Sequence, residues 1–128
     1  MRRFDGATPI YLQIAEEIRS QILGGELAEG ARLTSTTEYA ARYRINPATA
    51  NKAVALLVDE GLVVKRRGIG MFVADGALAG LRRSRRAAYA DGVLHPALDT
   101  GLALGLSDAE LRDAVIQYLT TRARKETR

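Results

Sequence analysis

The 128-residue sequence contains no cysteine and no tryptophan, and it has a single histidine. Without cysteine the chain cannot form disulfides or thiolate zinc sites, which fits a reducing compartment. His95 precedes Pro96 and has no clustered carboxylates beside it, so we interpret it as a helix residue and expect no metal site. The few serines show no nucleophile and base pattern with the histidine, so we predict no catalytic residue, no cofactor and no enzyme.

Long hydrophobic runs are also missing. No apolar stretch approaches the roughly 18 to 20 residues that cross a bilayer. The first six residues are basic but lack the apolar core of a secretory signal. We therefore expect a soluble, cytoplasmic protein without a membrane partner.

Negative charge is scarce in the middle of the chain. The net charge is +4, and residues 62–90 carry seven basic side chains against one acidic side chain, Asp75. This distribution is consistent with a polyanionic partner. For the run Arg82 to Arg86, an ordinary solvated helix face is an equally good explanation.

The length of the chain allows one compact domain, or a small domain with a helical appendage.

The first third of the sequence has the pattern of two helices. Thr8-Pro9 is expected to open the first, because threonine can cap free amides and proline suits the first helical position. Gly24-Gly25 ends it. Ser35 and Glu38 stand three residues apart as a capping box for a short second helix that ends near Tyr43. The apolar stripe of the first helix recurs every four residues, at Ile10, Ile14, Ile18 and Ile22.

A third helix and a glycine-tipped hairpin follow. Asn46-Pro47 caps and starts the helix, and Gly61 ends it. Residues 62–64 and 71–73 are predicted to be short strands. Three helices and a hairpin within residues 1–75 are typical of a winged helix-turn-helix, although the local pattern alone fits an ordinary small α+β core as well. The residues that we expect the third helix to bury are Ala50, Ala53, Val54, Leu57 and Val58.

The C-terminal part, residues 76–128, is expected to be a short helical dimerisation domain. Residues 77–104 read as one long helix or two, because Pro96 should kink or split it. Ser107 and Glu110 form a second capping box for a last helix with a continuous apolar stripe. So small a partner cannot bury both apolar faces, which indicates a second copy of the chain. Packing on the winged domain within a monomer is the alternative.

Several motifs occur in the order found in a known family. They are Pro9–Ala15, Ile22–Gly30, Ala53–Leu57, Glu60-Gly61-Leu62 and Gly68–Val73. These motifs resemble the GntR family of bacterial transcription regulators. Residues 105–111, which read Gly-Leu-Ser-x-x-Glu-Leu, together with Asn46-Pro47, are similar to its short YtrA-type branch. The resemblance implies a homodimeric DNA-binding repressor, often of a transporter operon.

The departures from the family concern positive charge. Position 34 is usually proline and position 37 usually a phosphate-binding arginine, but both are threonine here. Asn51 stands where a basic residue is frequent, and Ile69 where arginine often forms the hairpin tip. The resemblance therefore implies a protein that binds DNA with fewer arginines than its relatives.

Candidate site residues follow from their chemistry. Hydroxyls and free amides can hold phosphates, asparagine and lysine can read base edges, and a basic hairpin with glycines can approach the backbone. For Thr36 and Thr37 plain solvent exposure is an equal alternative, as is a tolerated exposed turn residue for Ile69. The candidate DNA contacts are Ser35, Thr36, Thr37, Asn46, Thr49, Asn51, Lys52, Lys65, Arg66, Arg67, Gly68, Ile69 and Gly70. The candidate dimer contacts are Leu98, Leu102, Leu111, Val115, Tyr118 and Leu119.

We thus predict a sequence-specific transcriptional regulator, a homodimeric repressor that binds a double-stranded, pseudo-palindromic DNA operator. Nothing local separates a repressor from an activator or dual regulator. The missing arginines keep a second class open, a winged-helix protein-interaction module that has lost specific DNA binding. A small-molecule effector between the C-terminal helices also stays open, without a residue that argues for it.

Overall fold

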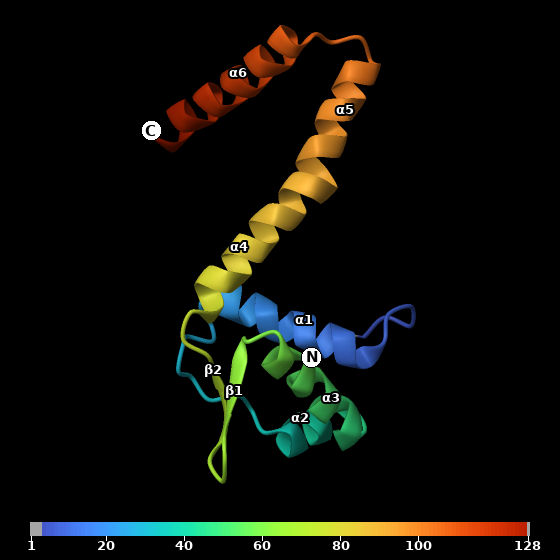
Figure 1. The fold of residues 1–128 in the computed structure, drawn as a ribbon, viewed down its shortest axis with the longest axis vertical. Coiled ribbons are helices and arrows are strands. Elements are labelled where there is room, and N and C mark those ends of the chain that lie inside the picture. Colours follow the sequence, from blue (N-terminus) through green and yellow to red (C-terminus); the bar gives the residue numbers. More distant parts are fainter. Residues whose placement is uncertain (1–3, 128) are drawn as a thin grey trace. The chain divides into compact units, whose positions relative to one another are not determined.

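The computed structural model describes residues 4–127 (Figure 1). The chain divides into two compact units, the first ending at Ser84 and the second beginning at Arg85. Residues 1–3, part of the basic start from which we judged the absence of a signal, lie outside the described residues, as does residue 128. The predicted fold class, mainly helical with a small antiparallel hairpin, is confirmed. The elements are α1 (Ile10–Leu23), α2 (Thr36–Tyr43), α3 (Pro47–Asp59), β1 (Val63–Arg66), β2 (Gly70–Val73), α4 (Ala77–Tyr89), η1 (Ala90–Leu94), α5 (His95–Ala103) and α6 (Asp108–Glu126).

The first unit extends beyond the predicted boundary at residues 75–76. Ala77 and Leu81, on the first two turns of α4, are buried in the same core as α1 and α3. Apolar side chains at this spacing lie on one face of a helix, so the start of α4 contributes to the winged unit. The second unit begins inside α4, at Arg85.

The start of α1 differs from the prediction. Its N-cap is Pro9, and no side chain caps it, so the expected role of Thr8 is wrong. Thr8 stands one residue too early for its hydroxyl to act as the cap. Its backbone is tied back instead: Asp5 Oδ1 accepts from the amide of Thr8 at 2.8 Å, and the Thr8 carbonyl accepts from the buried side chain of Gln13 at 2.7 Å.

The caps of α2 and α3 form where predicted. Ser35 Oγ accepts from the amide of Glu38 at 3.1 Å, which is the serine half of the expected box. Asn46 Oδ1 accepts from the amide of Ala48 at 2.9 Å, with proline in the first turn. The tight turn between the two helices passes through Arg44, whose φ of 53° lies in the left-handed region.

The two strands extend further toward the turn than predicted, and a third segment of backbone pairs with β2. β1 and β2 pair antiparallel with Val63 opposite Val73 and Arg66 opposite Gly70. Arg32 forms an isolated antiparallel bridge to Phe72 on the free edge of β2. The segment after α1 therefore covers that edge, which limits pairing with other chains.

The core of the first unit lies between α1, α3 and the hairpin. The predicted buried residues of α3 are buried with one exception: Val58 is 36% exposed. Val58 follows Leu57 on the helix and therefore points away from it, toward the space beside the hairpin. The largest fully buried side chains are Ile14, Ile22, Leu57, Val63 and Val73.

Pro96 is accommodated without ending the helical backbone. The preceding turn, η1, is π-helical, and the amide of His95 donates to the carbonyl of Ala90 five residues earlier. Proline lacks an amide and crowds the turn before it, so widening that turn removes the conflict. The expected interruption thus takes the form of a π-helical turn, followed directly by α5.

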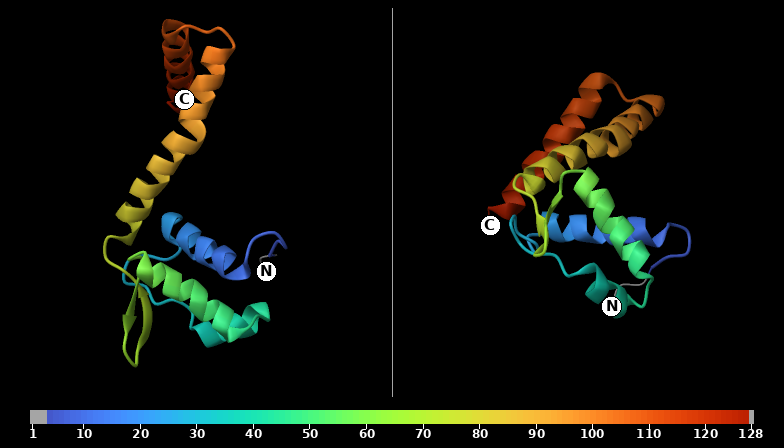
Figure 2. Two further views of the ribbon diagram at one scale, coloured as in Figure 1. Left: turned by 45° about the vertical axis from the view of Figure 1, so that its right-hand side comes forward. Right: turned by 60° about the horizontal axis from the view of Figure 1, so that its bottom comes forward.

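In the second unit α5 and α6 form a helical hairpin (Figure 2). Gly105, with a φ of +91°, ends the first arm, and the amide of Leu106 donates to the carbonyl of Gly101 at 3.1 Å. The predicted capping box of α6 is confirmed: Ser107 and Glu110 exchange bonds of 3.1 and 3.2 Å. Among the described residues, no helix has the length and apolar character to cross a membrane.

Candidate nucleic-acid interface

An open groove of about 610 Å³ lies between α3 and the hairpin. The strand pairing sets one wall and the exposed side of α3 the other, with the start of α2 at one end. Eight of the thirteen predicted DNA contacts line this groove. They are Ser35, Thr36, Asn51, Lys65, Arg66, Gly68, Ile69 and Gly70.

The other five predicted contacts lie outside the groove. Thr37 is exposed on the first turn of α2, and Arg67 is exposed at the hairpin tip. Thr49 is half-buried on α3. The side-chain oxygen of Asn46 caps α3, which leaves its amide group for another partner.

Lys52 makes a contact that the sequence did not indicate. Its ammonium nitrogen lies 4.2 Å from the centre of the Tyr11 ring, which projects from α1. An ammonium over an aromatic face is held by a cation–π attraction of about 0.5 to 1 kcal/mol at exposed sites. Lys52 therefore starts from an ordered position and must leave the ring to reach a distant partner.

Arg66 is also positioned by a ring. Its guanidinium carbon lies 4.6 Å from the centre of Phe72 across the hairpin. Ile69, at the tip, is 58% exposed. The hairpin thus presents a cation over a ring at the last residue of β1, beside the turn, and an apolar side chain at the tip.

Arg32 is a groove residue that the sequence analysis missed. It bridges Phe72 through its backbone, and its side chain lies against Gly70 on the groove side. The available signal was weak: one exposed arginine just before the buried Leu33, in a segment expected to be a turn. Only the pairing with β2, far along the chain, brings Arg32 to this surface.

The tyrosines of α2 are engaged inside the fold. The Tyr39 hydroxyl donates to Glu17 Oε2 at 2.7 Å, and the Tyr39 and Tyr43 rings stack with centroids 4.6 Å apart. Burial, and then the hydrogen bond to the Glu17 carboxylate, raises the pKa of Tyr39 above its ordinary value. Tyr39 therefore anchors α2 to α1, and its hydroxyl is occupied.

The groove carries a positive balance. Arg32, Lys65 and Arg66 line it together with one carboxylate, Asp59, at the last turn of α3. Its cations come from the hairpin and the segment paired with it, while Asn51 faces it from α3. This arrangement suits a ligand with a charged backbone on one side and hydrogen-bonding edges on the other.

The groove belongs to a part of the chain that matches a known family. The model of the gntR family of bacterial regulatory proteins matches residues 10–73, from the start of α1 to the end of β2. The chain belongs to this family. The match spans the three helices and the hairpin that form the groove.

Two curated transcriptional repressors are similar to part of the chain. It is 42% identical to the transcriptional repressor NagR of Bacillus subtilis over 77 residues, which cover 57% of this chain and 32% of NagR. It is 35% identical to the repressor YtrA of the same organism over 71 residues, which cover 56% of this chain and 55% of YtrA. The chain thus spans about a third and about half of these two proteins, and its resemblance to the YtrA-type branch holds.

Solved structures of the gntR family are also similar. A transcriptional regulator of the family from Bacteroides thetaiotaomicron, 29% identical, covers 88% of this chain and 98% of its own with a TM-score of 0.69. The DNA-binding domain of AraR, solved in complex with operator ORX1, is 31% identical, with a TM-score of 0.53 over 56% of this chain and 93% of its own. The winged helix-turn-helix fold is therefore shared with a protein solved on DNA.

The predicted dimer contacts lie in the second unit and fall into two groups. Four of them line an apolar groove of about 430 Å³ between α5 and α6: Leu98, Leu102, Leu111 and Val115. Tyr118 and Leu119 are exposed further along α6, at 69% and 55%. Ile116, not predicted, lines the same groove and is 60% exposed. Leu111 already packs between α5 and α6, against Gly101.

Proposed function

We propose that the protein is a sequence-specific DNA-binding transcriptional regulator that acts as a homodimeric repressor on a pseudo-palindromic operator. The observation that carries this proposal is the groove between α3 and the hairpin, with Asn51 on one wall and Lys65 and Arg66 on the other. It lies within the segment that matches the gntR family. The operator complex of AraR supports DNA as the partner of such a segment.

In this proposal the first turns of α3 enter the major groove. Asn51 is suited to an adenine edge, which presents an acceptor and a donor to the two ends of an amide. Thr49 and Lys52 complete the base-facing set, with Lys52 released from Tyr11 on binding. Asn46 contributes its free amide group beside them.

The hairpin and the start of α2 then hold the DNA backbone. Lys65, Arg66 and Arg67 neutralise phosphates, and Gly68, Ile69 and Gly70 form a tip narrow enough to approach the sugars. Ser35, Thr36 and Thr37 offer hydroxyls at the α2 end of the groove. Phosphate contacts set position and affinity, while α3 supplies the choice of sequence.

Pairing of two chains through α5 and α6 would give the complex two-fold symmetry. These helices expose several large apolar side chains to solvent, which favours their burial against a second copy of the chain. Two α3 helices related in this way suit half-sites about 34 Å apart, one helical repeat of DNA. Repression then follows from occlusion of polymerase on the chromosome, in the cytoplasm. Control of a transporter operon is the corresponding hypothesis for the target.

Footprinting on the DNA upstream of the protein's own gene tests this function. We expect two protected half-sites related by two-fold symmetry and centred about one helical repeat apart. Protection of a single half-site would refute the dimeric arrangement. Absence of protection from any fragment of that region, at low salt and micromolar protein, would contradict operator binding there.

A further inference from the structure

The side chain of Arg32 is placed by the backbone of the hairpin. The amide of Leu33 donates to the Met71 carbonyl at 2.8 Å, and the amide of Val73 donates to the Ala31 carbonyl at 2.9 Å. These two bonds flank the bridge between Arg32 and Phe72. Arg32 thus occupies a strand position beside β2, where its Cα cannot move independently of the hairpin.

Gly70 makes room for the guanidinium. A Cβ atom built on Gly70 would lie 2.9 Å from Arg32 Nε and 3.4 Å from its Cζ, so any side chain at position 70 would displace the arginine. The φ of Gly70, +145°, also lies in a region that side chains rarely adopt. The guanidinium therefore rests on bare backbone, on the wall of the groove between α3 and the hairpin.

The charge of Arg32 is not used within the fold. Among residues 4–127, no carboxylate forms an ion pair with its guanidinium, whereas Arg19 pairs with Glu60 and Arg122 with Glu126. Asp59 is the one carboxylate among the lining residues, and it comes from the last turn of α3. An exposed guanidinium that is carried on held backbone and neutralises no internal charge is suited to an external anion.

We propose that Arg32 binds a phosphate of the DNA backbone and supplies the positive charge that Thr37 does not provide. This inference rests on the proposed function, because it requires DNA in the groove. A phosphate is favoured over a base edge, since Arg32 stands on the hairpin side of the groove and not on α3. Ser35 and Thr36 line the same groove, so the phosphate would lie between the hairpin and the start of α2.

The test measures binding to a DNA fragment from upstream of the protein's own gene as a function of salt. Arg32→Ala is compared with the wild type, with Arg32→Lys, and with Arg82→Ala, which removes an exposed arginine of α4 outside the groove. We expect Arg32→Ala to lower affinity roughly tenfold or more and to reduce the slope of log affinity against log salt by about 0.9. Arg32→Lys should keep most of the slope, and Arg82→Ala should match the wild type.

The outcomes separate the inference from the function on which it rests. If the wild type binds with a steep salt dependence and Arg32→Ala does the same, Arg32 is not at the interface and the inference is wrong. If Arg32→Ala keeps the slope but loses discrimination between fragments, Arg32 reads a base and the phosphate assignment is overturned. If the wild type itself shows no salt-dependent binding, the proposed function fails and the inference with it. Circular dichroism confirms that each variant is folded, and Arg32→Lys covers a failure of Arg32→Ala to fold.

Discussion

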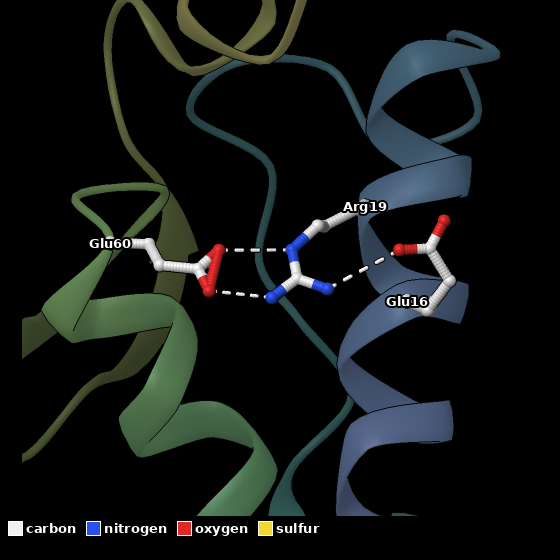
Figure 3. Close-up of polar contacts among 3 residues, drawn as sticks. All are labelled: Glu16, Arg19 and Glu60. Carbon is white, nitrogen blue, oxygen red and sulfur yellow. Dashed lines mark hydrogen bonds and ion pairs between the residues drawn. The ribbon is translucent and has the colours of Figure 1, made fainter. Parts of the chain in front are cut away.

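The guanidinium of Arg19 holds the carboxylate of Glu60 through two hydrogen bonds, Nε to Oε1 at 2.9 Å and Nη2 to Oε2 at 2.5 Å (Figure 3). A third bond, Nη1 to Glu16 Oε2 at 3.3 Å, orients the guanidinium from within α1. The hydrogen bond to Glu60 is the main reason why the pKa of Arg19 is raised. The pair links the C-terminal half of α1 to the C-cap residue of α3, the helix that carries Asn51.

We predict that Glu60→Gln lowers the free energy of unfolding by about 1 kcal/mol, because one charge-assisted pair is lost while the side chain stays polar. Urea denaturation measures the change, and Glu26→Gln, on an exposed turn, serves as the control. Arg19 stays charged at all physiological pH values, so the difference between Glu60→Gln and the wild type should be constant from about pH 6 to about pH 9. A difference no larger than that of the control would mean that the pair does not stabilise the fold.

We predict that the fold loses stability at alkaline pH because of Tyr39. Burial raises the pKa of its hydroxyl, and the bond to the Glu17 carboxylate adds to the shift. The phenol therefore stays neutral in the fold while it ionises near pH ~10 in the unfolded chain. Its contribution is present below that pH and is lost as the pH rises further. Between about pH 9 and about pH 11, the free energy of unfolding should fall less for Tyr39→Phe than for the wild type. Tyr89→Phe, which changes an exposed ring, should follow the wild type.

Two helical glycines of the second unit should respond in opposite directions to alanine. A Cβ at Gly101 would lie 2.7 Å from Leu111 Cδ2, whereas a Cβ at Gly92 would meet nothing within 4 Å. We expect Gly92→Ala to raise the melting temperature, since alanine favours helix by about 1 kcal/mol. Gly101→Ala should lower it, because the Leu111 side chain must leave its packed position or α5 and α6 must move apart. Thermal unfolding followed by circular dichroism compares the two, and equal rises would contradict the close packing at Gly101.

Disruption of the proposed dimer is best tested away from Leu111. Leu111 is only partly exposed and packs on Gly101, so a charge there would open the helical hairpin as well as an interface. Val115 and Ile116 are 44% and 60% exposed. We predict that Val115→Asp with Ile116→Asp yields a folded monomer by sedimentation, while Gln117→Asp on the same helix leaves the wild-type association state. A double variant that sediments as a dimer would refute the role proposed for this face.

Local signals in the sequence predicted the elements well. Asn46-Pro47, Gly61 and the pair Ser107 and Glu110 act through hydrogen bonds within a few residues, so a short stretch of sequence contains all the partners. The groove and α3 contacts that were missed depend on segments that are distant in the sequence. Arg32 reaches the groove only through pairing with β2, and Lys52 meets a ring on α1.

The burial of Val58 was misjudged for a related reason. The helical stripe predicted an apolar core position, but the hairpin leaves that side of α3 open to the groove. Apolar periodicity identifies a face and not how far a partner covers it. The π-helical turn before Pro96 could not be predicted either, because the preference of proline indicates an interruption of the helix but not its form.

In the proposed function, the groove between α3 and the hairpin binds the DNA backbone and reads its bases. The most direct measurement is a salt titration of binding to DNA from upstream of the protein's own gene, for the wild type and for a variant with Lys65, Arg66 and Arg67 changed to alanine. We expect that log affinity of the wild type falls linearly with log salt, by about 0.9 for each phosphate contacted, and that the variant has a slope shallower by about 2 to 3. A wild-type affinity that does not change with salt, or the same slope for both proteins, would contradict the proposed function.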